Sequence, residues 1–117
     1  MINHRFIYDI EVVSVYDGDT IRVNIDLGFG VILKGDGKGV KLRLWGINTP
    51  EVRGTERTEG LKSKEALILM LKDKKVTLKT IRDKTGKYGR YLAILYIDDV
   101  NINEKLVSEG FAEKRMY

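Results

Sequence analysis

Two stretches of the sequence gather oxygen-bearing side chains that could hold a hard cation. In RLWGINTPEV, residues 43–52, a hydrophobic run breaks into a polar turn around the chain's only proline, Pro50. In DGDT, residues 17–20, two aspartates flank a glycine. Carboxylate, amide and carbonyl oxygens are the ligands that calcium and magnesium prefer in proteins. The sequence therefore offers a divalent-cation site, provided that folding brings the two stretches together.

Each stretch also has a plainer interpretation, in which its polar residues only form a turn. Asp-Gly is a common hairpin signal, so Asp17 and Asp19 would merely solvate that turn, and an asparagine-initiated turn would leave Glu51 facing water. Alternatively, a strand that begins at Asp19 aims this carboxylate at one face of a sheet, while Asp17 shapes the turn. In the second stretch Asn48 would then offer an amide oxygen, Thr49 a carbonyl and a hydroxyl, and Glu51 a carboxylate.

Two arginines lie close to polar turns along the chain. Arg43 precedes Asn48 by five residues on the same predicted strand, and Arg90 opens the strand that follows KTGKYG. Guanidinium groups match the paired oxygens of a phosphodiester and stay charged when enclosed, so two of them could stabilise a phosphoryl transition state. Either one alone is more simply a solvated arginine among 21 basic residues. Trp45 is expected in the core rather than as a base-stacking platform.

Composition narrows the possible chemistry by elimination. The chain has no cysteine and one histidine, His4, near its terminus, which argues against thiol nucleophiles, Ser-His-Asp triads and multi-histidine metal centres. A formal charge of +4 favours a polyanionic partner such as nucleic acid, although inert basic domains share this property. No segment approaches the roughly 18–20 apolar residues that span a bilayer. Because the N-terminus does not resemble a signal peptide, a cytoplasmic protein is expected unless a leader was removed.

Apolar periodicity predicts the elements that must position these residues within one domain of 117 residues. In order, it predicts a strand over 6–15, a strand over 21–27, and a run over 30–45 in which glycines around Asp36 and Lys38 mark a second tight turn before the strand that ends at Trp45. It then predicts a polar loop over 52–60, a helix over 61–74, strands over 75–81 and 90–97, and a helix capped by Asn101 that stops at Gly110. Five short strands with a helix after the third suit a five-stranded OB-fold Greek-key barrel with two packed helices, a mainly β fold of the α+β class. An open α+β sheet is the competing arrangement.

Three motifs in this order, DGDT, LRLWGINTPE and DKTGKYGR, resemble the staphylococcal nuclease family, whose members are also called thermonucleases. The resemblance runs from about Val12 to Ala112. It implies an OB barrel that hydrolyses DNA and RNA phosphodiester bonds with calcium and leaves 3'-phosphate products. DNA or RNA is then the expected partner of a monomer that makes no membrane contact.

The same resemblance assigns roles to individual residues. It implies that Asp19, Asn48 and Thr49 are metal ligands, that Arg43 and Arg90 are the catalytic arginines together with Glu51 beside the attacking water, and that Lys87, Tyr88 and Arg57 contact the substrate.

Asn48 is the principal departure from the family pattern, because the better-known members carry an aspartate at this place. An amide oxygen still coordinates calcium, but losing a carboxylate generally weakens an oxygen site. We therefore expect a functional site with weaker metal affinity. The competing interpretation is a catalytically idle module that holds nucleic acid without retaining metal; no feature favours a protein-binding adaptor. The connection over residues 28–39 is longer than in those members, and a protruding surface hairpin is expected there.

Overall fold

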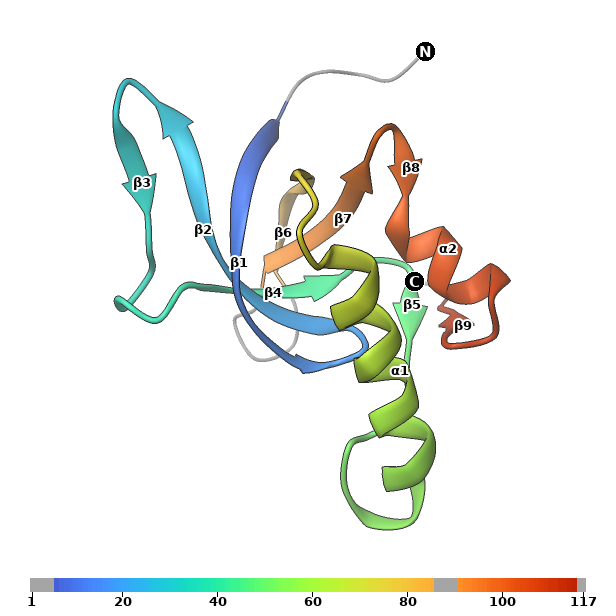
Figure 1. Ribbon diagram of the computed structural model, residues 1–117. Helices are drawn as coiled ribbons and strands as arrows, with labels where there is room; N and C mark the ends of the chain where they lie inside the picture. Colours follow the sequence, from blue (N-terminus) through green and yellow to red (C-terminus); the bar gives the residue numbers. More distant parts are fainter. Residues whose placement is uncertain (1–5, 86–90, 116–117) are drawn as a thin grey trace.

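The computed structural model describes residues 6–85 and 91–115 of the chain, with side chains described outside 82–85. Five strands form a closed hydrogen-bonded ring (Figure 1). Around the ring they are β1 (Ile7–Asp17), β2 (Thr20–Gly28), β4 (Val40–Leu44), β7 (Tyr91–Ile97) and β6 (Val76–Thr85), which returns to β1. Neighbours are antiparallel except β4 and β7, which are parallel. The predicted α+β class, mainly sheet with two helices, is confirmed, and the strands close on themselves rather than forming an open sheet.

Four shorter strands extend this arrangement. β3 (Val31–Leu33) pairs with the end of β2, β8 (Val100–Asn101) pairs with β7, and β5 (Ile47–Asn48) pairs with β9 (Glu113–Lys114) in a separate two-stranded sheet. The tight turn that the sequence predicts around Asp36 lies between β3 and β4. The expected protruding hairpin is present: β3 stands away from the ring in Figure 1, and its three residues are exposed.

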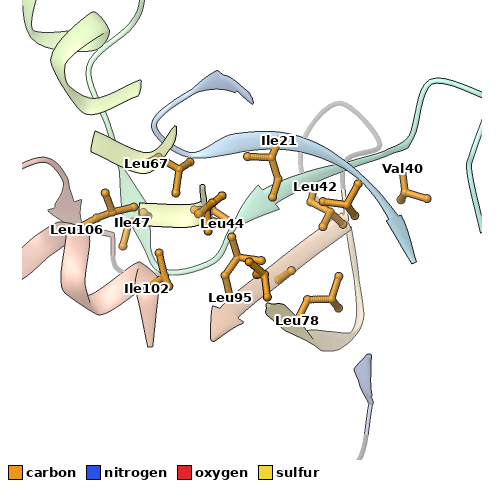
Figure 2. Packing of buried hydrophobic residues seen from close by; sticks show 14 of the residues in the cluster. Ile21, Val40, Leu42, Leu44, Ile47, Leu67, Leu78, Leu95, Ile102 and Leu106 are labelled. Atoms are coloured by element: carbon orange, nitrogen blue, oxygen red, sulfur yellow. The ribbon is translucent and has the colours of Figure 1, made fainter. Parts of the chain in front are cut away.

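Alternating side chains of the ring strands build the core (Figure 2). Ile21 and Val23 of β2 and Leu42 and Leu44 of β4 are at most 2% exposed. Successive residues of a strand point to opposite faces. The residues between them, among them Arg43, consequently point to the outer face of the ring, although Arg43 is only 7% exposed there.

Helix α1 (Arg57–Leu71) begins earlier than the sequence predicts, after a short 3-10 turn, η1 (Gly54–Glu56). The predicted loop over 52–60 is therefore wrong in its last four residues. Gly60 accounts for the error in the prediction. A glycine usually argues against a helix, but Gly60 is buried in the first turn of α1. A Cβ at this position would lie 2.0 Å from the carbonyl oxygen of Glu51, so only glycine lets the helix approach the turn after Pro50. Leu61, the apolar residue that opens the predicted helix, is exposed.

Helix α2 (Ile102–Ser108) starts at the predicted cap, because Asn101 Oδ1 accepts a hydrogen bond of 3.0 Å from the backbone N of Glu104. Its buried Asn103 ties the end of β4 to β7. The Nδ2 of Asn103 donates to the carbonyl oxygens of Trp45 at 2.9 Å and Ala93 at 3.1 Å, and its Oδ1 accepts from the backbone N of Leu95. Within the described ranges, neither helix has the length and apolar character needed to cross a membrane.

Candidate functional site

The turn between β1 and β2 meets the end of β4 at one edge of the ring. Thr20 is the register partner of Arg43, and the backbone N of Leu44 donates to the carbonyl oxygen of Asp19 at 2.8 Å. This pairing places Arg43 Nη1 2.8 Å from Asp19 Oδ2, with the side chains only 8% and 6% exposed. The register of two neighbouring strands thus creates a buried ion pair from residues far apart in the sequence.

The turn after β4 folds back over this ion pair. Arg43 Nη2 donates to the carbonyl oxygen of Ile47 at 3.1 Å and also to Asn48 Oδ1. The backbone N of Thr49 donates to Asp19 Oδ2 at 2.9 Å. Asp19, Arg43, Asn48 and Thr49, which the sequence analysis selected from two separate stretches, therefore contact one another directly.

Glycine at position 18 allows the two turns to approach so closely. A Cβ there would lie 2.8 Å from Cγ2 of Thr49 and 2.9 Å from Cβ of Ser63 on α1. Ser63 is itself held in place, because its hydroxyl donates to the carbonyl oxygen of Phe111 at 2.6 Å. The β1–β2 turn, the β4–β5 turn and α1 are consequently packed into one unit.

Asp17 has the turn-shaping role that the sequence predicts, because its Oδ1 accepts a hydrogen bond of 3.0 Å from the backbone N of Asp19. It is also buried, at 6% exposure. Burial, followed by the side-chain hydrogen bond to Asp19 and the charge of Asp19, raises the pKa of Asp17 to about 7. Burial alone would also raise the pKa of Asp19, but hydrogen bonds with Asp17 and Arg43, and the charge of Arg43, hold it below its usual value. Near neutral pH Asp19 is thus ionised while Asp17 is only partly so.

This proton-holding behaviour of Asp17 is a property that reasoning from the sequence missed. The available signal was the spacing of two aspartates across one glycine, which places two carboxyl groups at the same strand end. Whether such a pair is buried depends on the packing of α1 and the β4–β5 turn, which the motif itself does not reveal.

The remaining predicted residues lie at the edge of this cluster or outside the described residues. Glu51 is exposed, and its charge contributes to the raised pKa of Asp17, so its carboxylate is within electrostatic reach of the buried acids. Arg57 is exposed at the start of α1. Lys87, Tyr88 and Arg90 lie outside the described residues.

Trp45 is not in the core, contrary to the sequence-based prediction. It is 37% exposed. It follows Arg43 by two positions, so the alternation of β4 directs it to the outer face rather than into the ring. A large apolar side chain suggested burial, but strand phase decided its side of the sheet.

The donor atoms of the cluster suit a hard cation. They are oxygens of a carboxylate at Asp19, an amide at Asn48, and a hydroxyl and backbone carbonyl at Thr49. The hydroxyl oxygen Thr49 Oγ1 is buried without a hydrogen-bond partner, which is unusual for a buried polar atom and is the kind of atom that a ligand would satisfy. Among the described residues no group of three or more acidic, histidine or cysteine side chains could hold a metal. These are donor types that calcium takes in proteins, with one carboxylate among them.

The chain is thus a mainly β domain whose five-stranded ring carries a buried acid–arginine cluster at one edge. Residues 41–117 match the family described as staphylococcal nuclease homologue, and the chain belongs to this family. The prediction of family membership is confirmed.

Several relatives agree with this assignment. The chain is 34% identical over 110 residues to a thermonuclease of Staphylococcus hyicus, covering 92% of this chain and 59% of that protein. It is 32% identical over 106 residues to a thermonuclease of Staphylococcus intermedius, covering 88% and 57%. An uncharacterized endonuclease of Haemophilus influenzae is 35% identical over 101 residues, covering 86% and 49%. The chain thus spans roughly half to three-fifths of the length of these relatives.

Proposed function

We propose that this chain is a calcium-dependent endonuclease that hydrolyses phosphodiester bonds of DNA or RNA to 3'-phosphate products. The observation that carries the proposal is the direct contact of Asp19, Arg43, Asn48 and Thr49 at one edge of the ring. Membership of a nuclease family supports it, as do relatives named thermonuclease.

Arg43 is the residue best placed to act on a phosphate. Its guanidinium is oriented by Asp19, the carbonyl oxygen of Ile47 and Asn48, so little conformational freedom is left to lose on binding. Such a preorganised cation in a largely water-free position stabilises negative charge that develops on phosphate oxygens. We assign Arg43 to stabilisation of the transition state, with Arg90 as the second arginine by resemblance.

Asp19, Asn48 and Thr49 are the residues that would hold calcium. When bound, the ion polarises a phosphoryl oxygen and offsets negative charge at the phosphate. Asp19 suits this role because its pKa is held below the usual value, so it remains ionised without the ion.

Glu51 would handle the attacking water. It is exposed, unlike the buried acids, and so can reach a water on the substrate side. The water oxygen attacks phosphorus and the bond to the 5' oxygen breaks. Glu51 either accepts the water's proton or orients the water while solvent accepts that proton, and the departing 5' oxygen takes a proton from solvent. Arg57, exposed at the start of α1, and Lys87 with Tyr88 are assigned to substrate phosphate contacts by resemblance.

The second candidate function is a nucleic-acid-binding module without catalysis. Asn48 favours it, because this amide replaces a charged ligand and its oxygen already accepts a hydrogen bond from Arg43. A site with one fewer carboxylate has a lower affinity for calcium. The two functions share the fold and the partner and differ only in whether the partner is cut.

Incubation with labelled single-stranded DNA, with calcium or with chelator, separates the two functions. The nuclease predicts fragments that disappear with chelator and in the Arg43→Ala and Glu51→Gln variants. Lys62→Ala, a change of an exposed lysine paired with Glu59 on α1, is the matched control that should keep cleaving. The Arg43→Ala and Glu51→Gln variants, purified identically, reveal any contaminating nuclease. Retardation of the DNA without fragments under every metal condition would favour the binding module.

A further inference from the structure

A groove of about 510 Å³ lies on the outer face of the ring, beside the candidate site. Its lining includes Thr20 together with one aromatic and three basic side chains, Tyr16, Arg22, Lys41 and Lys64. We call it the basic groove. Helix α1 supplies Lys64, while β1, β2 and β4 supply the others, so four elements build it.

The basic groove is continuous with the acid–arginine cluster. Thr20 pairs with Arg43 in the β2–β4 register, and the Thr20 hydroxyl donates to Asp19 Oδ1 at 3.1 Å. Lys41 precedes Arg43 by two positions on the same face of β4. Alternate residues of a strand are about 6.7 Å apart, which is comparable with the spacing of consecutive phosphates along an extended nucleic-acid strand. A strand with one phosphate at Arg43 would therefore present its next phosphate at Lys41.

The basic side chains of the groove are incompletely neutralised by the protein. Arg22 and Lys41 are directly opposite one another on β2 and β4, an arrangement of like charges that costs stability. Arg22 has one acidic neighbour, Asp36, at 3.5 Å. Within the part of the chain that the structure describes, Lys41 and Lys64 make no ion pair, unlike Lys62 and Lys105, which pair with glutamates. A bound polyanion would relieve this repulsion.

Tyr16 owes its exposed position to a β-bulge. Val15 pairs with Ile21 and Asp17 with Thr20, so Tyr16 is an extra residue on β1 without a partner across the strand pair. Bulges re-aim side chains and are common next to active sites. Tyr16 is 52% exposed at the groove. An aromatic ring beside a track of cations is the combination that binds single-stranded nucleic acid, through stacking and phosphate contacts.

We propose that the basic groove binds the part of a single-stranded nucleic acid that flanks the cleaved linkage. Lys41, Lys64 and Arg22 contact its phosphates, and one of its bases stacks on Tyr16. A single strand fits better than a duplex, because only an unpaired base exposes a face for stacking. The location of the cleaved linkage rests on the proposed nuclease function, whereas binding in the groove does not.

The test measures binding with cleavage switched off. The anisotropy of a labelled octanucleotide is titrated with the full chain in chelator, over a range of salt concentrations. The Lys41→Ala/Lys64→Ala variant should bind on the order of tenfold more weakly at low salt, and the slope of log affinity against log salt should fall by about 1.4, or about 0.7 for each phosphate that the protein no longer neutralises. Lys62→Ala/Lys105→Ala, which removes the same charge elsewhere, should change affinity less than about twofold.

Tyr16 is tested by a variant that leaves the charge unchanged. Tyr16→Ala should lower the affinity on the order of tenfold without altering the salt slope, and Tyr16→Phe should restore it, because stacking needs the ring but not the hydroxyl. Tyr16 is exposed, so both variants should fold, which thermal unfolding followed by circular dichroism verifies.

The outcomes separate this inference from the proposed function. If wild type cleaves DNA with calcium but the groove variants bind the octanucleotide like wild type, the groove proposal is overturned and the nuclease stands. If groove-dependent binding occurs without cleavage, the groove is supported and the nuclease is contradicted. If Tyr16→Ala has no effect and heparin competes as well as DNA, the groove is a general polyanion surface and the single-strand proposal is overturned.

Discussion

Arg43 Nη1 lies 2.8 Å from Asp19 Oδ2 in a position where both side chains are more than nine-tenths buried. Asp19 lies in the turn between β1 and β2 and Arg43 lies on β4, and Asp17, Asn48 and Thr49 all bind one or the other. This ion pair is therefore both the structural link between the two turns and the centre of the candidate site. If the proposed function holds, stability and catalysis depend on the same contacts, so both must be measured for each variant.

Removal of Arg43 should destabilise the fold as well as stop catalysis. Arg43→Ala leaves Asp19 buried without its counter-charge, for which the expected loss of unfolding free energy is about 3–5 kcal/mol. Urea unfolding in chelator measures it. Arg43→Met combined with Asp19→Asn should recover part of this loss, because no unpaired charge remains. A loss below about 1 kcal/mol in the single variant would mean that the pair behaves like an exposed one.

Asp17 should make the metal-free protein less stable as pH rises from about 4 to about 7. Its pKa is raised from 3.8 to about 7, so between these values the folded chain holds a proton that the unfolded chain has released. The stability associated with this proton is complete below pH 3.8, falls through the interval, and stays low above pH 7.

The Asp17→Asn variant tests this pH dependence. Its amide can keep the hydrogen bonds without ionising, so it should melt above wild type at pH 8 in chelator, and the difference should shrink at pH 5. Asp26→Asn, a change of an exposed aspartate on β2, is the control. Equal pH profiles for wild type and Asp17→Asn would show that Asp17 titrates normally.

Asn48→Asp should tighten calcium binding. The substitution adds a carboxylate to the oxygen set, and ligand charge tunes calcium affinity over orders of magnitude. Isothermal titration calorimetry with calcium measures the effect directly, without any need for activity. Asn101→Asp adds the same charge at the N-cap of α2 and should leave the affinity unchanged. Equal or weaker binding by Asn48→Asp would remove Asn48 from the ligand set.

Gly60→Ala should destabilise the protein although alanine is the better helix former by about 1 kcal/mol. The added methyl would meet the carbonyl of Glu51 at 2.0 Å, so α1 must move away from the turn that carries the candidate site. Thermal unfolding should show a lower melting temperature, whereas Thr58→Ala, on an exposed position of the same helical turn, should not. A more stable Gly60→Ala variant would show that propensity outweighs this contact.

Local patterns in the sequence predicted the elements that depend on local physics. Alternation located the ring strands, and the asparagine at position 101 marked the start of α2 through a capping bond that forms within one turn. Two polar stretches of the sequence marked Asp19, Asn48 and Thr49 as candidate site residues, and folding places them around the same arginine and turn.

The features that were missed depend on tertiary contacts. Gly60 resembles a helix breaker unless the close approach of the Glu51 carbonyl is known. The sequence therefore places the start of α1 four residues too late. Trp45 resembles a core residue unless the phase of β4 is known. The bulge at Tyr16 comes from a register shift between β1 and β2, which no single motif encodes.

The central claim is that the Asp19–Arg43 cluster cuts phosphodiester bonds, and analysis of product ends tests it most directly. A defined single-stranded oligonucleotide is incubated with calcium, and the fragments are weighed by mass spectrometry before and after phosphatase treatment. The account predicts calcium-dependent fragments that carry 3'-phosphates, formed about 100- to 1,000-fold more slowly by Arg43→Ala and at the wild-type rate by Lys62→Ala. Intact oligonucleotide with wild-type protein and calcium, or equal cleavage by Arg43→Ala, would contradict it.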